Sequence, residues 1–374
     1  MSESRITAKR AASHATDEET AVAEVRRALG DGPLACVVLF CSPSYDLVRL
    51  GAALRRTFQA PVLACTSAGQ LGPEGYQKGG LTAVGLSSTE LQVRTHVIHS
   101  LAACHDRAVA LAETISREVA AEPAGTRAFG LVLVDGLALA EEHLAAALHE
   151  GLDDVPLIGG SAGDDLAFTA THVYVDGAFV QDAAMLAIFV TTLPFVTFKF
   201  QQVEATRNRL VVTAADPDKR IIHEINGMPA ALAYAELVGV PVGELDAAVF
   251  SQNPLVYSVH GEPYVRSIAR VNADLSMTMF CAIQVGLVLS IGAAIDAVET
   301  VERAFAEVHA EVGEPAVVIG CDCILRRLDL ERQGIDDKVG ALLAHHGVVG
   351  FSTYGEQWNA VHVNQTFTGV AIGA

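Results

Sequence analysis

Short runs of hydrophobic residues alternate along the chain with segments whose hydrophobic positions fall three or four residues apart. Ala35–Ser42 is a continuous apolar run, which is typical of a strand buried on both faces. Residues 47–58 follow with leucines and a phenylalanine at helical spacing, and a second apolar run, PVLACTSAG, comes next. This order predicts a β-α-β unit.

The same order returns further along the chain, and each copy ends in a turn of small residues. In the first copy the strand VVLFC ends at Cys41, and the turn CTSAGQLG contains Gly69 28 residues later. In the second copy LVLVD ends at Asp135, and the turn GGSAGDDL contains Gly163, again after 28 residues. Equal spacing indicates a duplicated unit.

A third segment is a looser match to this pattern. AVVIGC ends at Cys321, and the turn GFSTYGEQ contains Gly355 after 34 residues. The extra length leaves open whether this segment is a third copy or a chance resemblance.

Alternating apolar and polar positions predict strands after the first two turns. LTAVGLSS is expected to pair with LQVRTHVI, and THVYVDGAFV with AAMLAIFVT. We therefore predict an α/β fold, with two α/β domains whose mixed sheets are built from duplicated βαβ-plus-hairpin units. The predicted division is a flexible N-terminus at residues 1–15, a first domain at 16–195 and a second at 196–374, because the strands beyond Pro194 become polar and alternating.

Composition and charge narrow the classes of function. The chain has 374 residues, 51% of them hydrophobic, which is ample material for folded domains. Its formal net charge of −19 disfavours binding to nucleic acid or to an anionic membrane surface. No apolar stretch reaches the length of a transmembrane span or signal peptide, and seven cysteines in apolar strands fit reduced thiols, so we expect a cytoplasmic protein.

The small-residue turns are the first candidates for a binding site. Strand ends that carry Ser, Thr and Gly present backbone N–H groups and hydroxyls without bulky side chains, as open sheets do at ligand sites. The residues predicted to contact a ligand there are Thr66, Ser67, Gly69, Ser161, Gly163, Gly355 and Glu356.

The last strand adds a polar face. Side chains alternate there, so His362 and Asn364 point away from the apolar face formed by Val361, Val363 and Phe367. Such a face either meets water or forms the wall of a pocket, in which His362 could ligate a metal or haem iron and Asn364 could donate hydrogen bonds. Arg266 could anchor a carboxylate or form an ordinary ion pair.

Signals for catalysis are weak. A hydrolase could be assembled from Cys65 or Cys321 with His362 and Glu356, yet no strained nucleophile turn or fixed spacing ties them together. Phosphate-binding and dinucleotide-binding fingerprints are missing, and Cys321 with Cys323 has no partner pair at structural-zinc spacing. We therefore expect a binding protein and no enzyme.

Four segments carry a family resemblance. FCSPSYD, ACTSAGQLGPEGY, GCDCILRRL and GFSTYGEQWNAVHVNQTFTG, in this order, resemble the FIST sensory domain family, with FIST N and FIST C halves over roughly Gly30 to Gly373. Among its branches the chain is most similar to the NosP-type proteins, which contain haem and sense nitric oxide. Relatives carry Glu after the first turn where this chain has Gln70, which places the expected site nearer the C-terminal half.

The resemblance implies a bacterial signalling role. It implies haem as cofactor, with His362 on the iron and Asn364, Arg266, Tyr354 and His346 around it. Nitric oxide binding would then alter a separate histidine kinase or cyclic-di-GMP enzyme. If His362 is not the ligand, His346, His260 and His223 are the next candidates. The alternative is a FIST-type sensor of a small polar metabolite such as an amino acid, without haem.

Overall fold

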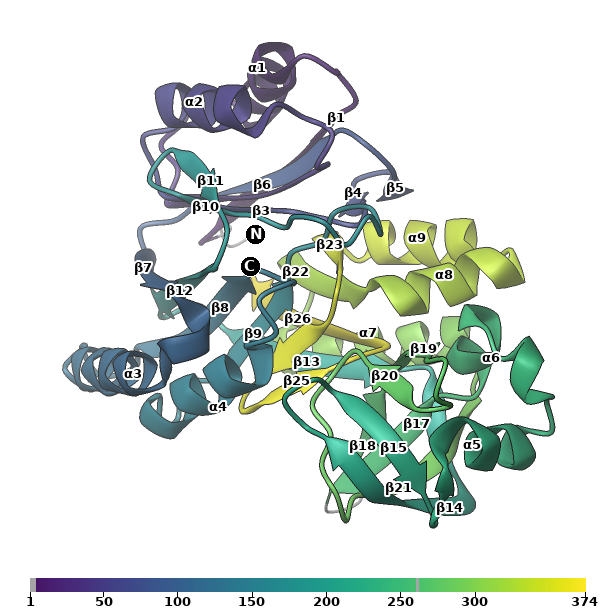
Figure 1. Cartoon of the computed structure of the whole chain (residues 1–374). Helices are drawn as coiled ribbons and strands as arrows, with labels where there is room; N and C mark the ends of the chain where they lie inside the picture. Colours follow the sequence, from purple (N-terminus) through teal and green to yellow (C-terminus); the bar gives the residue numbers. More distant parts are fainter. Residues whose placement is uncertain (1–4, 260–261) are drawn as a thin grey trace.

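The computed structural model describes residues 5–259 and 262–374 (Figure 1). Three α/β units follow one another along the chain, and each consists of a strand, a helix, a strand, a helical segment, a strand, a hairpin and a final strand. A β-rich body is inserted into the third unit. The helical layers of the three units lie on different sides of the molecule in Figure 1.

The first two units are continuous in sequence. Unit 1 contains β1 (Thr7–Ser13), α1 (Glu18–Leu29), β2 (Cys36–Cys41), α2 (Leu47–Thr57), β3 (Val62–Thr66), β4 (Gln70–Gly72), β5 (Gly75–Gln77) and β6 (Leu81–Ser87). Unit 2 contains β7 (Leu91–His99), a short 3-10 turn at Leu101–Ala103, α3 (His105–Ala120), β8 (Arg127–Val134), α4 (Glu141–Gly151), β9 (Leu157–Ser161), β10 (Val173–Val175), β11 (Ala178–Val180) and β12 (Ala183–Thr191).

The third unit is interrupted after its first strand. Unit 3 contains β13 (Phe195–Gln201), then α7 (Ala297–Val312), β22 (Pro315–Cys323), α8 (Ile324–Gln333), α9 (Asp336–His345), β23 (Val348–Thr353), β24 (Glu356–Trp358), β25 (Val361–Val363) and β26 (Thr366–Gly373). Two helices between β22 and β23, where the other units have one, explain the longer spacing to Gly355.

The described residues of the inserted body, 203–259 and 262–294, form a separate antiparallel sheet with two helices. Its elements are β14 (Val203–Asp216), β15 (Ile221–Ile225), β16 (Met228–Pro229), α5 (Ala230–Val238), a 3-10 turn at Val242–Glu244, α6 (Ala247–Gln252), β17 (Leu255–Val259), β18 (Glu262–Arg266), β19 (Ile268–Val271), β20 (Met277–Met279) and β21 (Val288–Ala294).

The strand orders show that the three units share one topology. The orders are β1-β6-β2-β3 in unit 1, β7-β12-β8-β9 in unit 2 and β13-β26-β22-β23 in unit 3. In each unit the strands flanking the second helical segment are parallel and the last strand is antiparallel to its neighbour. The looser third segment is therefore a third copy of the repeat.

Each unit completes its neighbour's sheet with its hairpin. The β4-β5 hairpin of unit 1 pairs with β23 of unit 3, β10-β11 of unit 2 pairs with β3 of unit 1, and β24-β25 of unit 3 pairs with β9 of unit 2. This closed exchange joins the three units into one structure. It also brings the three turns that precede the hairpins to the place where the sheets meet.

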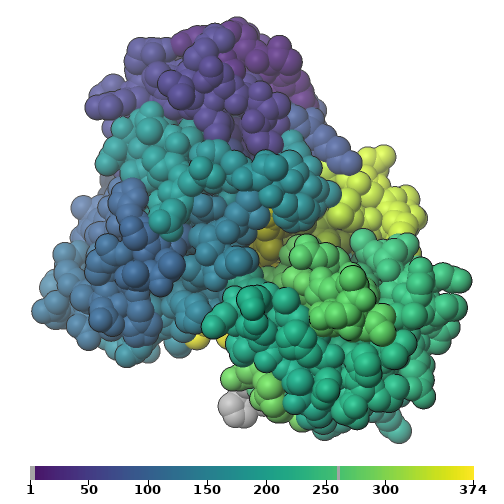
Figure 2. All heavy atoms as spheres, viewed as in Figure 1, coloured from purple at the N-terminus to yellow at the C-terminus, as the bar shows by residue number. Residues whose placement is uncertain are grey.

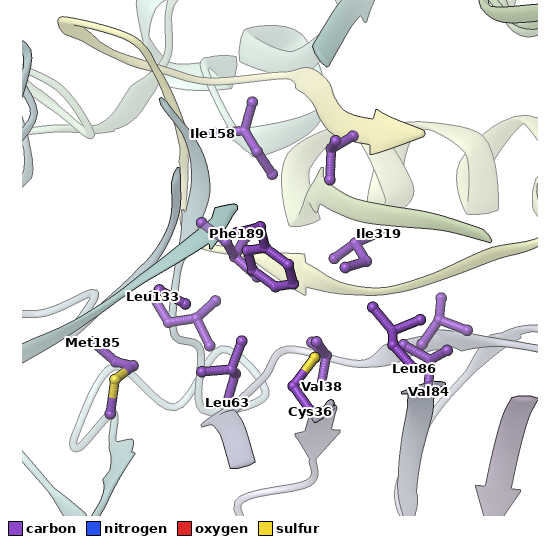
Figure 3. Packing of buried hydrophobic residues seen from close by; sticks show 14 of the residues in the cluster. Cys36, Val38, Leu63, Val84, Leu86, Leu133, Ile158, Met185, Phe189 and Ile319 are labelled. Carbon is purple, nitrogen blue, oxygen red and sulfur yellow. The ribbon is translucent and has the colours of Figure 1, made fainter. Parts of the chain in front are cut away.

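The inner faces of the three sheets bury a common core. Val38 of unit 1, Leu133 and Phe189 of unit 2, and Ile319 of unit 3 point into it (Figure 3). Apolar residues on the outer faces pack under each unit's own helices. Strands covered on both faces explain the continuous apolar runs in the sequence.

The predicted α/β class with mixed sheets is confirmed, and several local predictions are wrong. Residues 81–87 and 91–99 form strands, yet β6 and β7 lie in different sheets and do not pair. Residues 173–180 form the β10-β11 hairpin in the sheet of β3 and do not pair with β12. The expected last strand is two strands, β25 and β26, in different sheets. Residues 7–13, expected to belong to a flexible N-terminus, form β1 on the edge of the first sheet, because their backbone pairs with β6. The predicted boundary near residue 195 falls between β12 and β13, where unit 2 passes into unit 3.

Within the described residues, no helix combines the length and apolar character needed to cross a membrane.

Candidate functional site

The three small-residue turns meet and bond to one another. Between the second and third turns, the Ser161 N–H donates to the Gly355 carbonyl at 2.8 Å and the Tyr354 N–H donates to the Ser161 carbonyl at 3.1 Å. Between the first and second turns, the Gly163 N–H donates to the Thr66 carbonyl at 3.1 Å. The predicted turn residues from three distant parts of the sequence therefore share one buried place.

The first turn has its polar groups engaged. The Ser352 N–H donates to the Gly69 carbonyl at 2.8 Å, and Ser67 Oγ donates to the Cys41 carbonyl at 3.0 Å. A Cβ on Gly69 would lie 2.0 Å from Nη1 of Arg327, so an arginine of α8 fills the space in front of this turn. The first turn is therefore closely packed, and the polar groups that are free to bind a ligand lie elsewhere.

The third turn faces His362 directly. A Cβ built on Gly355 would lie 2.2 Å from Cε1 and 2.5 Å from Nε2 of His362, so only glycine leaves room for the imidazole. Gln357 Nε2 donates to Ser161 Oγ at 3.0 Å and lies 3.2 Å from His362 Nδ1. An amide that donates to Nδ1 leaves the imidazole proton on Nε2.

Polar atoms without partners concentrate around this glycine. Among the described residues, five buried side-chain atoms here have no hydrogen-bond partner: His362 Nε2, Gln357 Oε1, Asn364 Oδ1 and Nδ2, and Arg266 Nε. Most buried polar groups in proteins are paired, and a group of orphaned atoms marks a place for ordered water or a ligand. We call Gly355, Gln357, His362, Asn364 and Arg266 the Gly355 cluster.

The inserted body supplies one side of this cluster. Arg266 Nη1 donates to the His362 carbonyl at 2.9 Å, and Val265 forms a β-bridge with Asn364. The C-terminal hairpin, the second turn and the inserted body therefore meet at these side chains.

Burial controls the charge of His362 and of Glu356, which follows Gly355 in the third turn. It lowers the pKa of His362, against the carboxylates of Glu142 and Glu141, which raise it, so the imidazole is neutral at pH 7. Burial also raises the pKa of Glu356 well above its usual value, helped by Asp322. The Thr353 hydroxyl and the Thr366 N–H donate to this carboxyl group, the latter at 3.3 Å.

A cleft opens at the surface beside Arg266 of the cluster. It has a volume of about 430 Å³ and lies between the N-terminal end of α4 and the inserted body. Arg266 lines it together with Glu142, His143, Arg220 and Tyr257. Arg266 thus belongs both to the cleft and to the buried cluster, and the other members of the cluster do not line the cleft.

The other predicted histidines and Tyr354 lie apart from the cluster. His346 directly follows α9, where its ring stacks on Phe305 with centroids 4.2 Å apart, and His223 is exposed on β15. The prediction for His260 falls outside the described residues. Tyr354 turns its hydroxyl to Asp164, to which it donates a hydrogen bond, and it lines a different cleft.

The cysteines proposed for a hydrolase point into the common core. Cys65 and Cys321 are fully buried among apolar side chains, and burial raises the pKa of both thiols. A raised thiol pKa disfavours the nucleophilic thiolate. The geometry therefore does not join either cysteine to His362 in a catalytic arrangement.

The surroundings of His362 do not fit haem. Haem needs an apolar slot on the iron-binding side of the histidine. Here the imidazole lies against the backbone of Gly355, and its neighbours Gln357, Asn364 and Arg266 are polar. Within the described residues no group of three or more His, Cys, Asp or Glu side chains is arranged to hold a metal ion.

Sequence reasoning identified four of the five cluster residues and missed Gln357; it also missed Arg220 and Glu142, which line the neighbouring cleft. Gln357 follows Gly355 by two residues in the third turn, and this spacing could have revealed it. Arg220 and Glu142 carried no local signal, since they meet only through the packing of the inserted body on α4.

These features define an α/β protein of three fused units, in which the second and third units and the inserted body enclose a buried polar site. The FIST N domain matches residues 35–228 and the FIST C domain matches residues 230–359. The chain therefore belongs to the FIST family, whose domains are sensor domains, and it has a ligand-binding role in signalling.

Other comparisons add little. No curated protein matches the chain in sequence. Among solved structures it is similar to the cyanuric acid hydrolase of A. caulinodans, with 11% identity and a TM-score of 0.30 over 51% of this chain and 72% of that one. A likeness at this level carries no argument about function.

Proposed function

We propose that this FIST chain senses a small polar molecule bearing a carboxylate, such as an amino acid, bound at the Gly355 cluster. The observation that carries the proposal is the group of five buried polar atoms without partners in His362, Asn364, Gln357 and Arg266. Leaving such atoms unpaired costs about 1–3 kcal/mol each, a cost that a bound ligand relieves.

The chemistry of the cluster favours this ligand class. Arg266 offers a guanidinium, and the Asn364 amide and the His362 Nε2–H offer further donors, which suits a carboxylate. Gln357 Oε1 and Asn364 Oδ1 are acceptors, which suit an ammonium or hydroxyl group. Donors and acceptors within one small space favour a zwitterion over a purely anionic molecule.

The position of the cluster supports a signalling output. Arg266 and the Val265–Asn364 bridge connect the inserted body to the C-terminal hairpin at the cluster itself. A ligand that bonds to both sides favours one arrangement of the body on the three units over others. A histidine kinase or cyclic-di-GMP enzyme that reads this arrangement stays a prediction from the family resemblance.

Haem-based sensing of nitric oxide stays the second candidate. One observation favours it, the buried His362 Nε2 without a partner. Haem binding at His362 would require the hairpin of residues 356–363 to move away from Gly355, because the His362 imidazole lies against that glycine.

Thermal unfolding in the presence of each of the twenty amino acids, added singly, tests the proposal. A ligand present at about 100 times its Kd raises the unfolding midpoint by about 3–5 °C. Asn364→Leu abolishes this rise and raises the midpoint of the ligand-free protein, since it removes unsatisfied polar atoms from a buried site. Arg266→Gln weakens the response, and Arg209→Gln, at an exposed arginine of the same body, leaves it intact.

The opposite outcomes are distinct. A rise that persists in both Asn364→Leu and Arg266→Gln would place the ligand elsewhere. No response to any amino acid, together with a Soret band on haem addition that disappears in His362→Ala, would favour the haem candidate.

A further inference from the structure

A second cleft lies beside the first and differs in chemistry. It has a volume of about 330 Å³ and forms where unit 2, the inserted body and the C-terminal turn meet, a region that is hollowed in Figure 2. Its apolar lining includes Leu139 and Phe168 from unit 2, Met279 and Phe280 from the inserted body, and Tyr354. The Gly355 cluster has no side chain in it.

Aromatic rings form one wall. The ring of Phe168 stacks on that of Tyr354, with centroids 4.9 Å apart and planes 22° apart, and it faces Phe280 at 6.2 Å. Phe168 is nevertheless 47% exposed and Leu139 is 58% exposed. Large apolar side chains held in the open at one cleft are typical of a binding surface.

The loops hold these side chains in strained conformations. Leu139, Leu166 and Phe168 have φ values of 53°, 66° and 51°, in the left-handed region that bulky residues avoid. Such strain persists where surrounding contacts impose it, and it clusters at ligand sites.

One carboxylate imposes the conformation of Phe168. Asp164 accepts hydrogen bonds from the N–H groups of Phe168 at 2.9 Å, Thr169 at 2.7 Å and Ala170 at 2.9 Å, and from the Tyr354 hydroxyl. Both stacked rings are therefore fixed by the same group before any ligand binds. Preorganisation of this kind lowers the entropic cost of binding.

A cation lies at the rim. Arg270 is exposed and lines the cleft, and its Nε donates to Asn272 Oδ1 at 3.2 Å, which restrains the side chain. Arg220 also lines this cleft, but it already forms ion pairs with Glu141 and Glu142 and donates a hydrogen bond to the Phe280 carbonyl. In a chain of net charge −19, Arg270 therefore gives this apolar cleft a local attraction for an anion.

We propose that this cleft binds a planar aromatic carboxylate of one or two rings. The ligand's rings stack on the exposed side of Phe168 and contact Tyr354 and Met279, and the carboxylate pairs with Arg270. The volume of the cleft lies at the lower end of ligand pockets, which suits a molecule of this size. The site is separate from the Gly355 cluster and goes beyond the proposed function.

Calorimetric titration with 2-naphthoate tests the proposal. We expect saturable binding of one molecule per chain. Phe168→Ala weakens it by about tenfold or more, because a stacked aromatic contact and its buried area are lost. Arg270→Gln weakens 2-naphthoate similarly but leaves the binding of uncharged 2-naphthalenemethanol unchanged.

Matched controls separate these effects from general ones. Val48→Ala removes an exposed apolar side chain on α2, and Arg209→Gln removes an exposed arginine of the inserted body; both leave 2-naphthoate binding unchanged. Asn364→Leu also leaves 2-naphthoate binding unchanged. The amino-acid site and this cleft can therefore be tested separately, and either proposal can fail without the other.

Three results would overturn the proposal. The first is no saturable binding of 2-naphthoate up to 1 mM, about the weak end of measurable affinity. The second is equal affinity for cyclohexanecarboxylate, which would mean that planarity is not recognised. The third is concentration-dependent dimerisation that blocks 2-naphthoate and is lost in Phe168→Ala, since the occupant would then be a second copy of the chain.

Discussion

The buried carboxyl group of Glu356 makes the stability of the folded protein depend on pH. Glu356 follows Gly355 in the third turn, is fully buried, and has its pKa raised well above the usual value of 4.5 by burial and by Asp322. When a carboxyl group has a higher pKa in the folded state than in the unfolded state, the free energy of unfolding falls as the pH rises above 4.5.

We predict that Glu356→Gln stabilises the protein increasingly above pH 4.5. The amide keeps an acceptor for the Thr366 N–H and cannot ionise, so the gain reaches about 1–3 kcal/mol at pH 7 and vanishes near pH 4.5. Urea unfolding at both pH values measures it. Glu307→Gln, at an exposed position on α7, should change stability by less than about 0.5 kcal/mol at either pH.

The converse result would refute this explanation. If Glu356→Gln destabilised the protein at pH 7 and were neutral at pH 4.5, the carboxyl group would be ionised and favourable in the folded state.

At the scale of elements, the exchanged hairpins hold the units together by specific side chains. Tyr76 on the β4-β5 hairpin of unit 1 donates its hydroxyl to Asp322 of unit 3. Asp322 also pairs with Arg326 at 2.7 Å, and both charged side chains are fully buried. The hairpin thus supplies a hydrogen bond that this buried ion pair needs.

We predict that Tyr76→Phe destabilises the protein by about 1–3 kcal/mol, because it leaves a buried oxygen of Asp322 without its donor. Urea unfolding measures the loss. Tyr264→Phe is the matched control, since the Tyr264 hydroxyl has no hydrogen bond to the described residues. Equal effects of the two variants would show that the hairpin is held by its backbone pairing alone.

At the scale of the whole molecule, one arginine fastens the inserted body to unit 2. Arg220 of the body contacts Glu141 at 2.7 Å and Glu142 at 2.6 Å, both at the start of α4. Glu142 also accepts a hydrogen bond from the Ala282 N–H. This contact lies between the two clefts, so it is positioned to transmit binding at either one.

We predict that Arg220→Gln loosens the body from α4. Removing one partner of a buried ion pair costs about 3–5 kcal/mol, which weakens the contact between the two parts. Hydrogen exchange should become faster in residues 135–145 and 277–283. Lys219→Gln, which removes the exposed Lys219–Asp216 pair, should leave exchange in these segments unchanged.

Unchanged exchange in Arg220→Gln would contradict this role. The body would then be held by its other contacts, among them the Arg266–His362 hydrogen bond and the Val265–Asn364 bridge.

Local pattern in the sequence determined the repeating strands and helices and the residues of the turns. Apolar runs identified buried strands, and counting from Cys41 and Asp135 located Gly69 and Gly163 as equivalent positions. Alternation put His362 and Asn364 on a polar face, and both lie in the cluster, although the expected last strand is two strands, 361–363 and 366–373, in different sheets. These predictions succeed because period and spacing are properties of neighbouring residues.

Only the tertiary structure decided which strands pair and which side chains meet. The pattern of 81–87 and 91–99 identified two strands, but the exchange of hairpins put them in different sheets. The same packing set His346 apart on Phe305, brought Gln357 to His362, and brought Arg220 to α4. Pairing partners and buried polar contacts depend on how three sheets close around one core, and residues far apart in sequence carry no periodic signal of that closure.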